Sequence, residues 1–388
     1  MKLPSWPVFD KEQIDKTQEI LESGKVNYWT GNEGKEFEKE FSRKFDSLYS
    51  VALANGSLAL SCAYLALNLK KGDEIITTPR TFIATSSSAV LLGLKPVFVD
   101  VDLNSGAITA ESILKAITNK TKAIVVVHLG GWPADMVQIC SIAKEYSIPI
   151  IEDCSQAHGA KLNGKNVGTY GDIATWSFCQ DKIITTGGEG GMLSTNNFNY
   201  FNKVWSFKDH GKSRELILNK SNSTSFKWVH NTFGSNFRLT EIQSSIGRIQ
   251  LKMLDEWVFL RNRNAKILIN YLNKFHQIRI PIPSKEIQHA YYKFYCYVEE
   301  KNFRDGWNRD RFVNELNKLG FPAFSGTCSQ IYLEKCFENI EFKINGSLKN
   351  ATKLGSTSLM FLVHPNLTTN DMHIYADKIS SLFEKTLK

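Results

Sequence analysis

The 388-residue chain lacks the patterns that would assign it to several common classes of protein. No apolar run resembles a membrane span, and residues 1–7 lack the apolar core of an export signal. The seven cysteines are scattered, without C-x-x-C spacing and without a zinc-like cluster of histidine and cysteine. We therefore expect a protein of the reducing cytoplasm, with no metal and no membrane association.

The net charge of +8 does not by itself indicate nucleic-acid binding. Lysines and arginines are dispersed, and no long basic run or nucleic-acid motif is present. A mildly positive surface equally suits an anionic small molecule, so we expect no nucleic-acid partner. With 42% hydrophobic residues and no internal repeats, the chain has the composition of an ordinary globular protein.

Short apolar runs alternate with helical patterns over the first two thirds of the chain. Strands are predicted at 75–78, 96–101, 123–129 and 148–152, and helices at 58–69, 86–94 and 135–145. This alternation predicts an α/β fold, with a mainly parallel sheet and helices on both faces. A helical stripe follows at 239–254. We divide the chain into a large domain, residues 1–253, and a small α+β C-terminal domain, residues 254–388.

Lys182 lies in the most distinctive stretch of the sequence, W-S-F-C-Q-D-K-I-I-T-T-G-G-E-G-G-M at 176–192. A strand-like segment precedes it, and four glycines follow, which allow the backbone to approach a ligand closely. An ordinary lysine, with a pKa of about 10.4, is a poor nucleophile at neutral pH and forms Schiff bases readily when its surroundings lower that value. A solvated turn lysine is the alternative, because lysine is seldom buried.

A second stretch, P-I-I-E-D-C-S-Q-A-H-G-A at 149–160, resembles a buried strand that ends in polar residues. Ligands of open α/β sheets bind at the carboxyl ends of strands, so Asp153, Gln156 and Lys182 are expected to share one crevice. Pyridoxal 5'-phosphate (PLP) needs this combination. Its aldehyde reacts with a lysine, and a carboxylate keeps its ring nitrogen protonated, so that the ring withdraws electrons.

Five motifs, in this order along the chain, resemble those of the DegT/DnrJ/EryC1/StrS aminotransferases. They are N-G-S at 55–57, P-R-T-F at 79–82, E-D-C-S-Q-A-H-G at 152–159, S-F-C-Q-D-K with G-G-E-G-G at 177–191, and N-F-R-L-T at 236–240. The resemblance implies the aspartate-aminotransferase-like fold (fold type I). It also implies a homodimer with shared active sites, in which Lys182 and Asp153 are catalytic.

The same resemblance implies a role for further residues around PLP. The phosphate donors would be Gly56, Ser57, Ser177 and, from the partner chain, Asn236. Phe82 would stack on the ring, and Gln156 would contact the ring hydroxyl or the ring face. From the residues alone, Ser57 could instead be an ordinary helix N-cap and Phe82 a core side chain. Sugar-side candidates are Tyr28, Trp29, Gly31 and His210.

The activity implied by the resemblance is transfer of an amino group from L-glutamate to a nucleotide-linked keto-deoxyhexose, with PLP alternating with its amino form, PMP. The sugar would be a 4-keto-6-deoxyhexose, with or without a 2-acetamido group, and some members of the family aminate position 3. Such products serve amino-sugar pathways, including those of lipopolysaccharide and O-antigen.

Three other functions are less compatible with these residues. Sugar dehydratases of the same family carry histidine in place of the lysine, and Lys182 therefore favours transamination. A regulator that binds PLP without catalysis would need a DNA-binding module, for which the chain leaves no room. A nicotinamide-dependent dehydrogenase would need G-x-G-x-x-G after its first strand, which Ala54-Asn55-Gly56-Ser57 does not provide.

Overall fold

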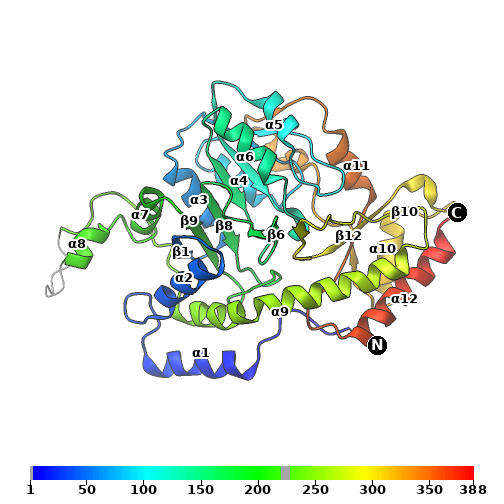
Figure 1. Cartoon of the computed structure of the whole chain (residues 1–388), viewed down its shortest axis with the longest axis horizontal. Coiled ribbons are helices and arrows are strands. Elements are labelled where there is room, and N and C mark those ends of the chain that lie inside the picture. The colour runs from blue at the N-terminus through cyan, green and yellow to red at the C-terminus, as the bar shows by residue number, and fades with distance from the viewer. Residues whose placement is uncertain (1–2, 220–227) are drawn as a thin grey trace.

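The computed structural model describes residues 3–219 and 228–388 (Figure 1). Within them, the largest sheet has eight strands in the order β1-β9-β8-β5-β4-β2-β3-β14. Their bounds are β1 Tyr49–Leu53, β2 Glu74–Thr77, β3 Lys95–Phe98, β4 Thr121–Val127, β5 Ile150–Asp153, β8 Ile173–Ser177, β9 Gly191–Thr195 and β14 Lys343–Ile344. Strand β9 runs antiparallel to both neighbours and the other pairs are parallel, so the mainly parallel sheet is confirmed.

Alternate side chains of β4 enter different cores, as expected for a strand buried on both faces. Ile124 and Val126 pack with one set of helices, whereas Val125 packs with another. Helices therefore cover both faces of the sheet, as predicted. Those that follow the strands are α3 Gly56–Ala66, α4 Ala84–Val90, α5 Ala110–Ala116, α6 Met136–Glu145, α7 Phe198–Phe207 and α8 Arg214–Asn219. In Figure 1, α8 projects away from the body.

Helix α9, Glu241–Leu272, connects the two parts of the molecule and extends well beyond the predicted end at residue 254. Its first half, with Leu254 and Val258, packs under the large sheet; its second half, with Leu268 and Leu272, belongs to the C-terminal core. The apolar face of α9 is therefore continuous, but it packs on the large sheet in its first half and on the C-terminal core in its second. Residue types alone do not show this change of packing partner. Helices α1 (Lys11–Ser23) and α2 (Glu33–Lys44) both contact α9.

The C-terminal region forms a sheet of four short strands in the order β10-β12-β15-β13. The elements are β10 Ile278–Arg279, β12 Phe294–Val298, β13 Ala323–Phe324, β15 Ser358–Phe361, α10 Arg309–Lys318, α11 Lys349–Thr357 and α12 Thr369–Thr386. The chain also returns to the large sheet, where β14 pairs with β3. A small sheet of β6 (Lys161–Leu162), β7 (Lys165–Asn166) and β11 (Ile287–Gln288) joins the two regions.

Apart from the end of α9, the predicted helices and strands are found close to their predicted bounds, but the helices α2, α5, α8 and α11 were not predicted. Among residues 3–219 and 228–388, no helix has both the length and the apolarity needed to cross a bilayer.

Candidate functional site

Lys182 follows β8 in a loop that is held close to the C-terminal region. Its Nζ lies 3.3 Å from the hydroxyl oxygen of Tyr292 and 3.4 Å from Oδ1 of Asp181. The side chain is only 16% exposed. Lys182 is therefore not a freely solvated turn lysine, and its amine is held next to the carboxyl edge of the large sheet.

Asp153 ends β5, the strand beside β8, and is paired in register with Thr175. The carboxylate is buried, and accepts hydrogen bonds from Thr85 Oγ1 at 2.9 Å and from the Ser155 amide at 3.2 Å. Two adjacent parallel strands thus bring the Asp153 carboxylate and the Lys182 loop to one edge of the sheet, as the sequence predicted. The hydroxyl and the amide fix the orientation of the carboxylate.

Gln156 and Phe82 lie on loops at the same edge. Gln156 is buried, and its Oε1 accepts a hydrogen bond from the Gly130 amide at 2.7 Å. Its amide NH₂ group makes no hydrogen bond to the part of the chain that the structure describes, so it can donate to a ligand. Phe82 is 67% exposed, so the alternative of a core phenylalanine is wrong. An exposed aromatic ring at this edge is suited to stack on a flat ligand.

The N-terminus of α3 lies against the end of β8. Asn55 caps the helix by accepting from the Leu58 amide, so Ser57 is not the N-cap; it is exposed in the first turn. A Cβ atom on Gly56 would lie 2.7 Å from the Cβ of Ser177, and only glycine therefore permits this approach. Gly56, Ser57 and Ser177 together offer helix N-terminal amides and hydroxyls, which is the donor set of a phosphate site.

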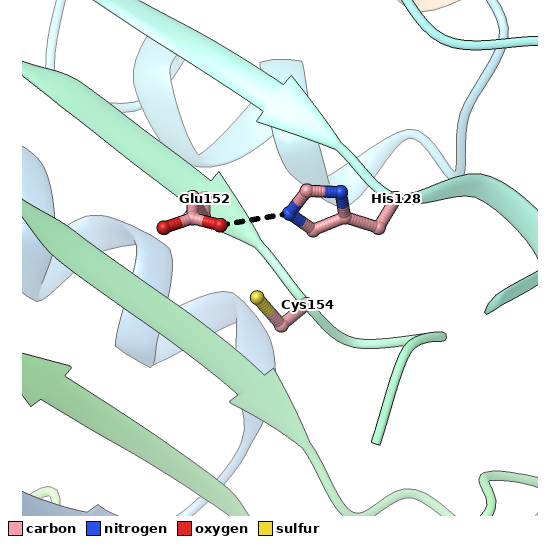
Figure 2. A group of neighbouring side chains, drawn as sticks. All are labelled: His128, Glu152 and Cys154. Atoms are coloured by element: carbon pink, nitrogen blue, oxygen red, sulfur yellow. Dashed lines mark hydrogen bonds and ion pairs between the residues drawn. The ribbon is translucent and has the colours of Figure 1, made fainter. Parts of the chain in front are cut away.

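His128, Glu152 and Cys154 form a buried group at the same ends of the strands (Figure 2), and their potential ligand atoms lie within 4.8 Å of one another. Hydrogen bonds already occupy the ligand atoms of His128 and Glu152. Glu152 accepts from three backbone amides, those of Gly168, Tyr170 and Gly171.

His128 uses both of its ring nitrogens within this buried group. Its Nδ1 accepts from the Ala134 amide, so its Nε2 carries the proton and donates to Glu152 at 3.0 Å. Burial opposes the charge of Glu152, but the bonds from His128 and the amides outweigh it and lower its pKa; burial raises the pKa of the Cys154 thiol well above its usual value. The group therefore fixes the loop that carries Gly130, and metal binding there would break the hydrogen bonds of His128 and Glu152.

The sugar-side candidates occupy different surroundings. Tyr28 is buried, and its hydroxyl donates to Glu38. Gly31 allows the close approach of Glu241, whose carboxylate accepts from the first amides of α2. These contacts give both residues a packing role, and their contact with a sugar stays a prediction.

Trp29, His210 and Asn236 gather around Asp209. The indole N–H of Trp29 donates to the Asp209 carboxylate, and Asn236 forms a β-bridge with Asp209. His210 and Asn236 are exposed on the single chain, where a substrate or a partner chain could reach them. Their roles also remain predictions.

Two residues near Lys182 were missed at the sequence level. Trp6 donates its indole N–H to the carbonyl oxygen of Lys182 at 2.9 Å, and Tyr292 contacts the Lys182 amine. Neither lies in a recognisable motif, and each meets Lys182 across more than a hundred positions. The positive-φ backbone of Tyr291 turns this segment, a feature with no signal in the residue type.

Cations surround this end of the site. Burial lowers the pKa of the Arg261 guanidinium to about 9, and burial together with Arg261 and Lys182 lowers the pKa of Lys293 to about 8, against the opposing effect of Asp181. Burial also lowers the pKa of His158 to about 3, so this histidine is neutral at pH 7. Asp181 is the carboxylate that faces both lysines.

The chain is similar to several known proteins. It is 36% identical over 289 residues to the GDP-perosamine synthase of Escherichia coli O157:H7, covering 74% of this chain and 76% of that protein. An aminotransferase structure from Psychrobacter cryohalolentis matches 99% of both chains at 46% identity, with a TM-score of 0.96. An E. coli GDP-4-keto-6-deoxy-D-mannose-3-dehydratase, solved with bound hydrated PLP, matches 98% of both chains at 26% identity, with a TM-score of 0.87.

The sheet, with a lysine and a carboxylate at its carboxyl edge, has the architecture of the fold type I PLP enzymes, as its structural neighbours do. The model of the DegT/DnrJ/EryC1/StrS aminotransferase family matches residues 7–380. The chain belongs to this family, and the fold inferred from its motifs is confirmed.

The residues of the site fit PLP on their own chemistry. A largely buried primary amine matches the aldehyde, a buried carboxylate held by Thr85 matches the ring nitrogen, and the Gly56–Ser57 amides beside Ser177 match the phosphate. Phe82 offers an exposed ring beside them.

Proposed function

We propose that the chain is a PLP-dependent aminotransferase that moves an amino group from L-glutamate to a nucleotide-linked keto-deoxyhexose. The observation that carries the proposal is the primary amine of Lys182, held next to the strand end that bears the buried Asp153. A 4-keto-6-deoxyhexose, with or without a 2-acetamido group, is the acceptor we expect. The GDP-perosamine synthase relative makes a GDP-linked sugar the first to test.

Each residue has a task in this proposal. Bound PLP supplies an electron sink for the carbon that loses its proton. Lys182 Nζ removes that proton and later returns one, while the Asp153 carboxylate holds a proton at the ring nitrogen. The Gly56 and Ser57 amides, with Ser177, bind the phosphate, and Phe82 covers one ring face and excludes water from it.

We further propose a cytoplasmic homodimer with shared active sites. Asn236 is exposed on the single chain, on the side of Asp209, and it would bind the phosphate of the partner's cofactor. The product would enter the synthesis of an amino sugar of the lipopolysaccharide or O-antigen type.

Dehydration of the sugar is the alternative, because a dehydratase is among the structural neighbours. The two reactions differ in product mass. Purified protein with PLP and L-glutamate should be incubated with GDP-, UDP- and dTDP-linked 4-keto-6-deoxyhexoses, followed by mass spectrometry. An aminated sugar, formed together with 2-oxoglutarate, supports the proposal; a sugar that has lost an oxygen and gained no nitrogen, formed together with 2-oxoglutarate and free ammonia, would overturn it.

A further inference from the structure

Three side chains, those of Asp181, Tyr292 and Lys293, lie around the amine of Lys182, and the motifs of the family do not include them all. Tyr292 and Lys293 come from the segment before β12, and Asp181 precedes the lysine. Lys182 Nζ lies 3.4 Å from Asp181 Oδ1, and Lys293 Nζ lies 3.7 Å from Oδ2 of the same carboxylate. The Tyr292 hydroxyl contacts both Asp181 and Lys182, and the ring centroid of Tyr292 is 5.0 Å from Lys182 Nζ.

We propose that Asp181 and Tyr292 form a holding site for the Lys182 amine whenever that amine is not bound covalently. This inference rests on the proposed function, in which an amino donor releases Lys182 in every catalytic cycle. A free lysine side chain has up to about 2 kcal/mol of rotamer entropy, so an unheld amine would seldom occupy the geometry that proton transfer requires. Two acceptors and an aromatic face limit the amine to one region.

The surroundings determine how firmly the amine is held. Lys293 faces Oδ2 of Asp181, whereas Lys182 faces Oδ1. The buried Arg261 lies behind the same segment, where its Nη1 donates to the carbonyl oxygens of Tyr291 and Tyr292. Arg261 therefore fixes the backbone of Tyr292, while Lys293 competes for the carboxylate. Because two cations share the single negative charge of this carboxylate, the hold on Lys182 stays weak enough for release. Asp181 and Tyr292 are thus positioning residues that act through Lys182.

The test measures how fast Lys182 captures PLP. Protein stripped of cofactor is mixed with PLP and quenched with borohydride at intervals, and mass spectrometry quantifies the pyridoxyl label on the Lys182 peptide. The variants are Asp181→Asn, Tyr292→Phe and the conservative Asp181→Glu. Tyr291→Phe is the matched control, because its hydroxyl makes no hydrogen bond within residues 3–219 and 228–388.

We expect Asp181→Asn and Tyr292→Phe to slow the labelling of Lys182 about tenfold or more, the effect of losing one hydrogen bond to a charged group. Asp181→Glu should restore most of the rate, which a merely structural role would not require, and Tyr291→Phe should match wild type. Wild-type rates in both test variants would overturn the holding site.

The outcomes for the holding site and for the proposed function remain distinct. If wild-type protein acquires no label on Lys182, the proposed function fails and the holding site fails with it. If wild type is labelled and the variants react equally fast, the holding site alone fails. Should Tyr292→Phe not fold, Asp181→Asn decides, because that carboxylate is about half exposed.

Discussion

Trp6 donates its indole N–H to the carbonyl oxygen of Lys182 at 2.9 Å, which ties the first residues of the chain to the candidate active site. The indole packs edge-on against Trp257 in α9 and stacks on His364 from the C-terminal region. The backbone of Lys182 is therefore fixed by the N-terminal segment, and its amine by the segment around Tyr292.

Replacing Trp6 by phenylalanine keeps an aromatic ring but leaves the Lys182 carbonyl without this donor. We expect the free energy of unfolding to fall by about 1–2 kcal/mol, the cost of one lost hydrogen bond at a partly buried acceptor. The first half-reaction with L-glutamate should also slow, because the Lys182 backbone gains freedom. Chemical denaturation and stopped-flow absorbance measure the two effects; wild-type values in both would show that the bond is incidental.

Glu152→Gln tests the structural role of the buried group at His128. The carboxylate accepts hydrogen bonds from three backbone amides and from the His128 N–H. In glutamine, an NH₂ group replaces one of the two oxygens, so it would face N–H groups that are themselves donors. We expect a loss of about 3 kcal/mol in the free energy of unfolding. Glu111→Gln, in an exposed pair with Lys115, is the control and should leave stability unchanged. Equal stability of E152Q and wild type would contradict the role.

The same group predicts a pH dependence. Because the folded-state pKa of Glu152 is lowered below its usual 4.5, its stabilisation is complete above that value. It is lost as the pH falls through the lowered folded-state pKa. Denaturation midpoints of wild type between neutral pH and pH of about 3 should therefore fall more steeply than those of E152Q. Parallel curves would show that Glu152 does not contribute.

Gly56→Ala tests the approach of α3 to β8. The added Cβ would lie 2.7 Å from Ser177 Cβ, so the helix N-terminus must move away from the strand end. We expect PLP to bind at least about tenfold more weakly, because hydrogen bonds to its phosphate depend on this spacing. Equilibrium dialysis measures the affinity, with Ser61→Ala farther along the same helix as the control. Unchanged affinity would remove the phosphate site from this position.

Mixing two inactive variants tests the shared active sites. A dimer of one Lys182→Ala chain and one Asn236→Ala chain would contain one site with both defects and one intact site. Random mixing makes half of the dimers mixed, so activity should return to about a quarter of the wild-type value. Activity that stays at the level of the separate variants would argue that each site is built from a single chain.

The sequence predicted the parts of the site that follow from strand order. Asp153 and Lys182 come after apolar strands, and adjacent parallel strands end at one edge of the sheet. Helix α2 was missed although Phe37 and Phe41 have helical spacing, because Gly31 and Gly34, just before and within its first turn, indicated a loop. That spacing is the signal that would have located it.

Other features of the site had no local signal. Strand β14 has two residues and pairs with β3 across more than two hundred positions, and Tyr292 meets Lys182 across more than a hundred. Such contacts depend on how the C-terminal region packs on the large sheet. The structure also decides two questions that residue types left open. Phe82 is exposed and so is not a core side chain, and Asn55, not Ser57, is the N-cap of α3.

The absorbance spectrum of the purified protein with PLP, recorded before and after addition of L-glutamate, is the most direct test of the proposed chemistry at Lys182. Wild type should show the band of lysine-linked cofactor near the visible edge, and glutamate should shift it to shorter wavelength. Asp153→Asn should keep the band but slow the shift, and Lys182→Ala should lack the band and all turnover. Full activity in Lys182→Ala, or a wild-type protein that binds no PLP, would contradict the assignment.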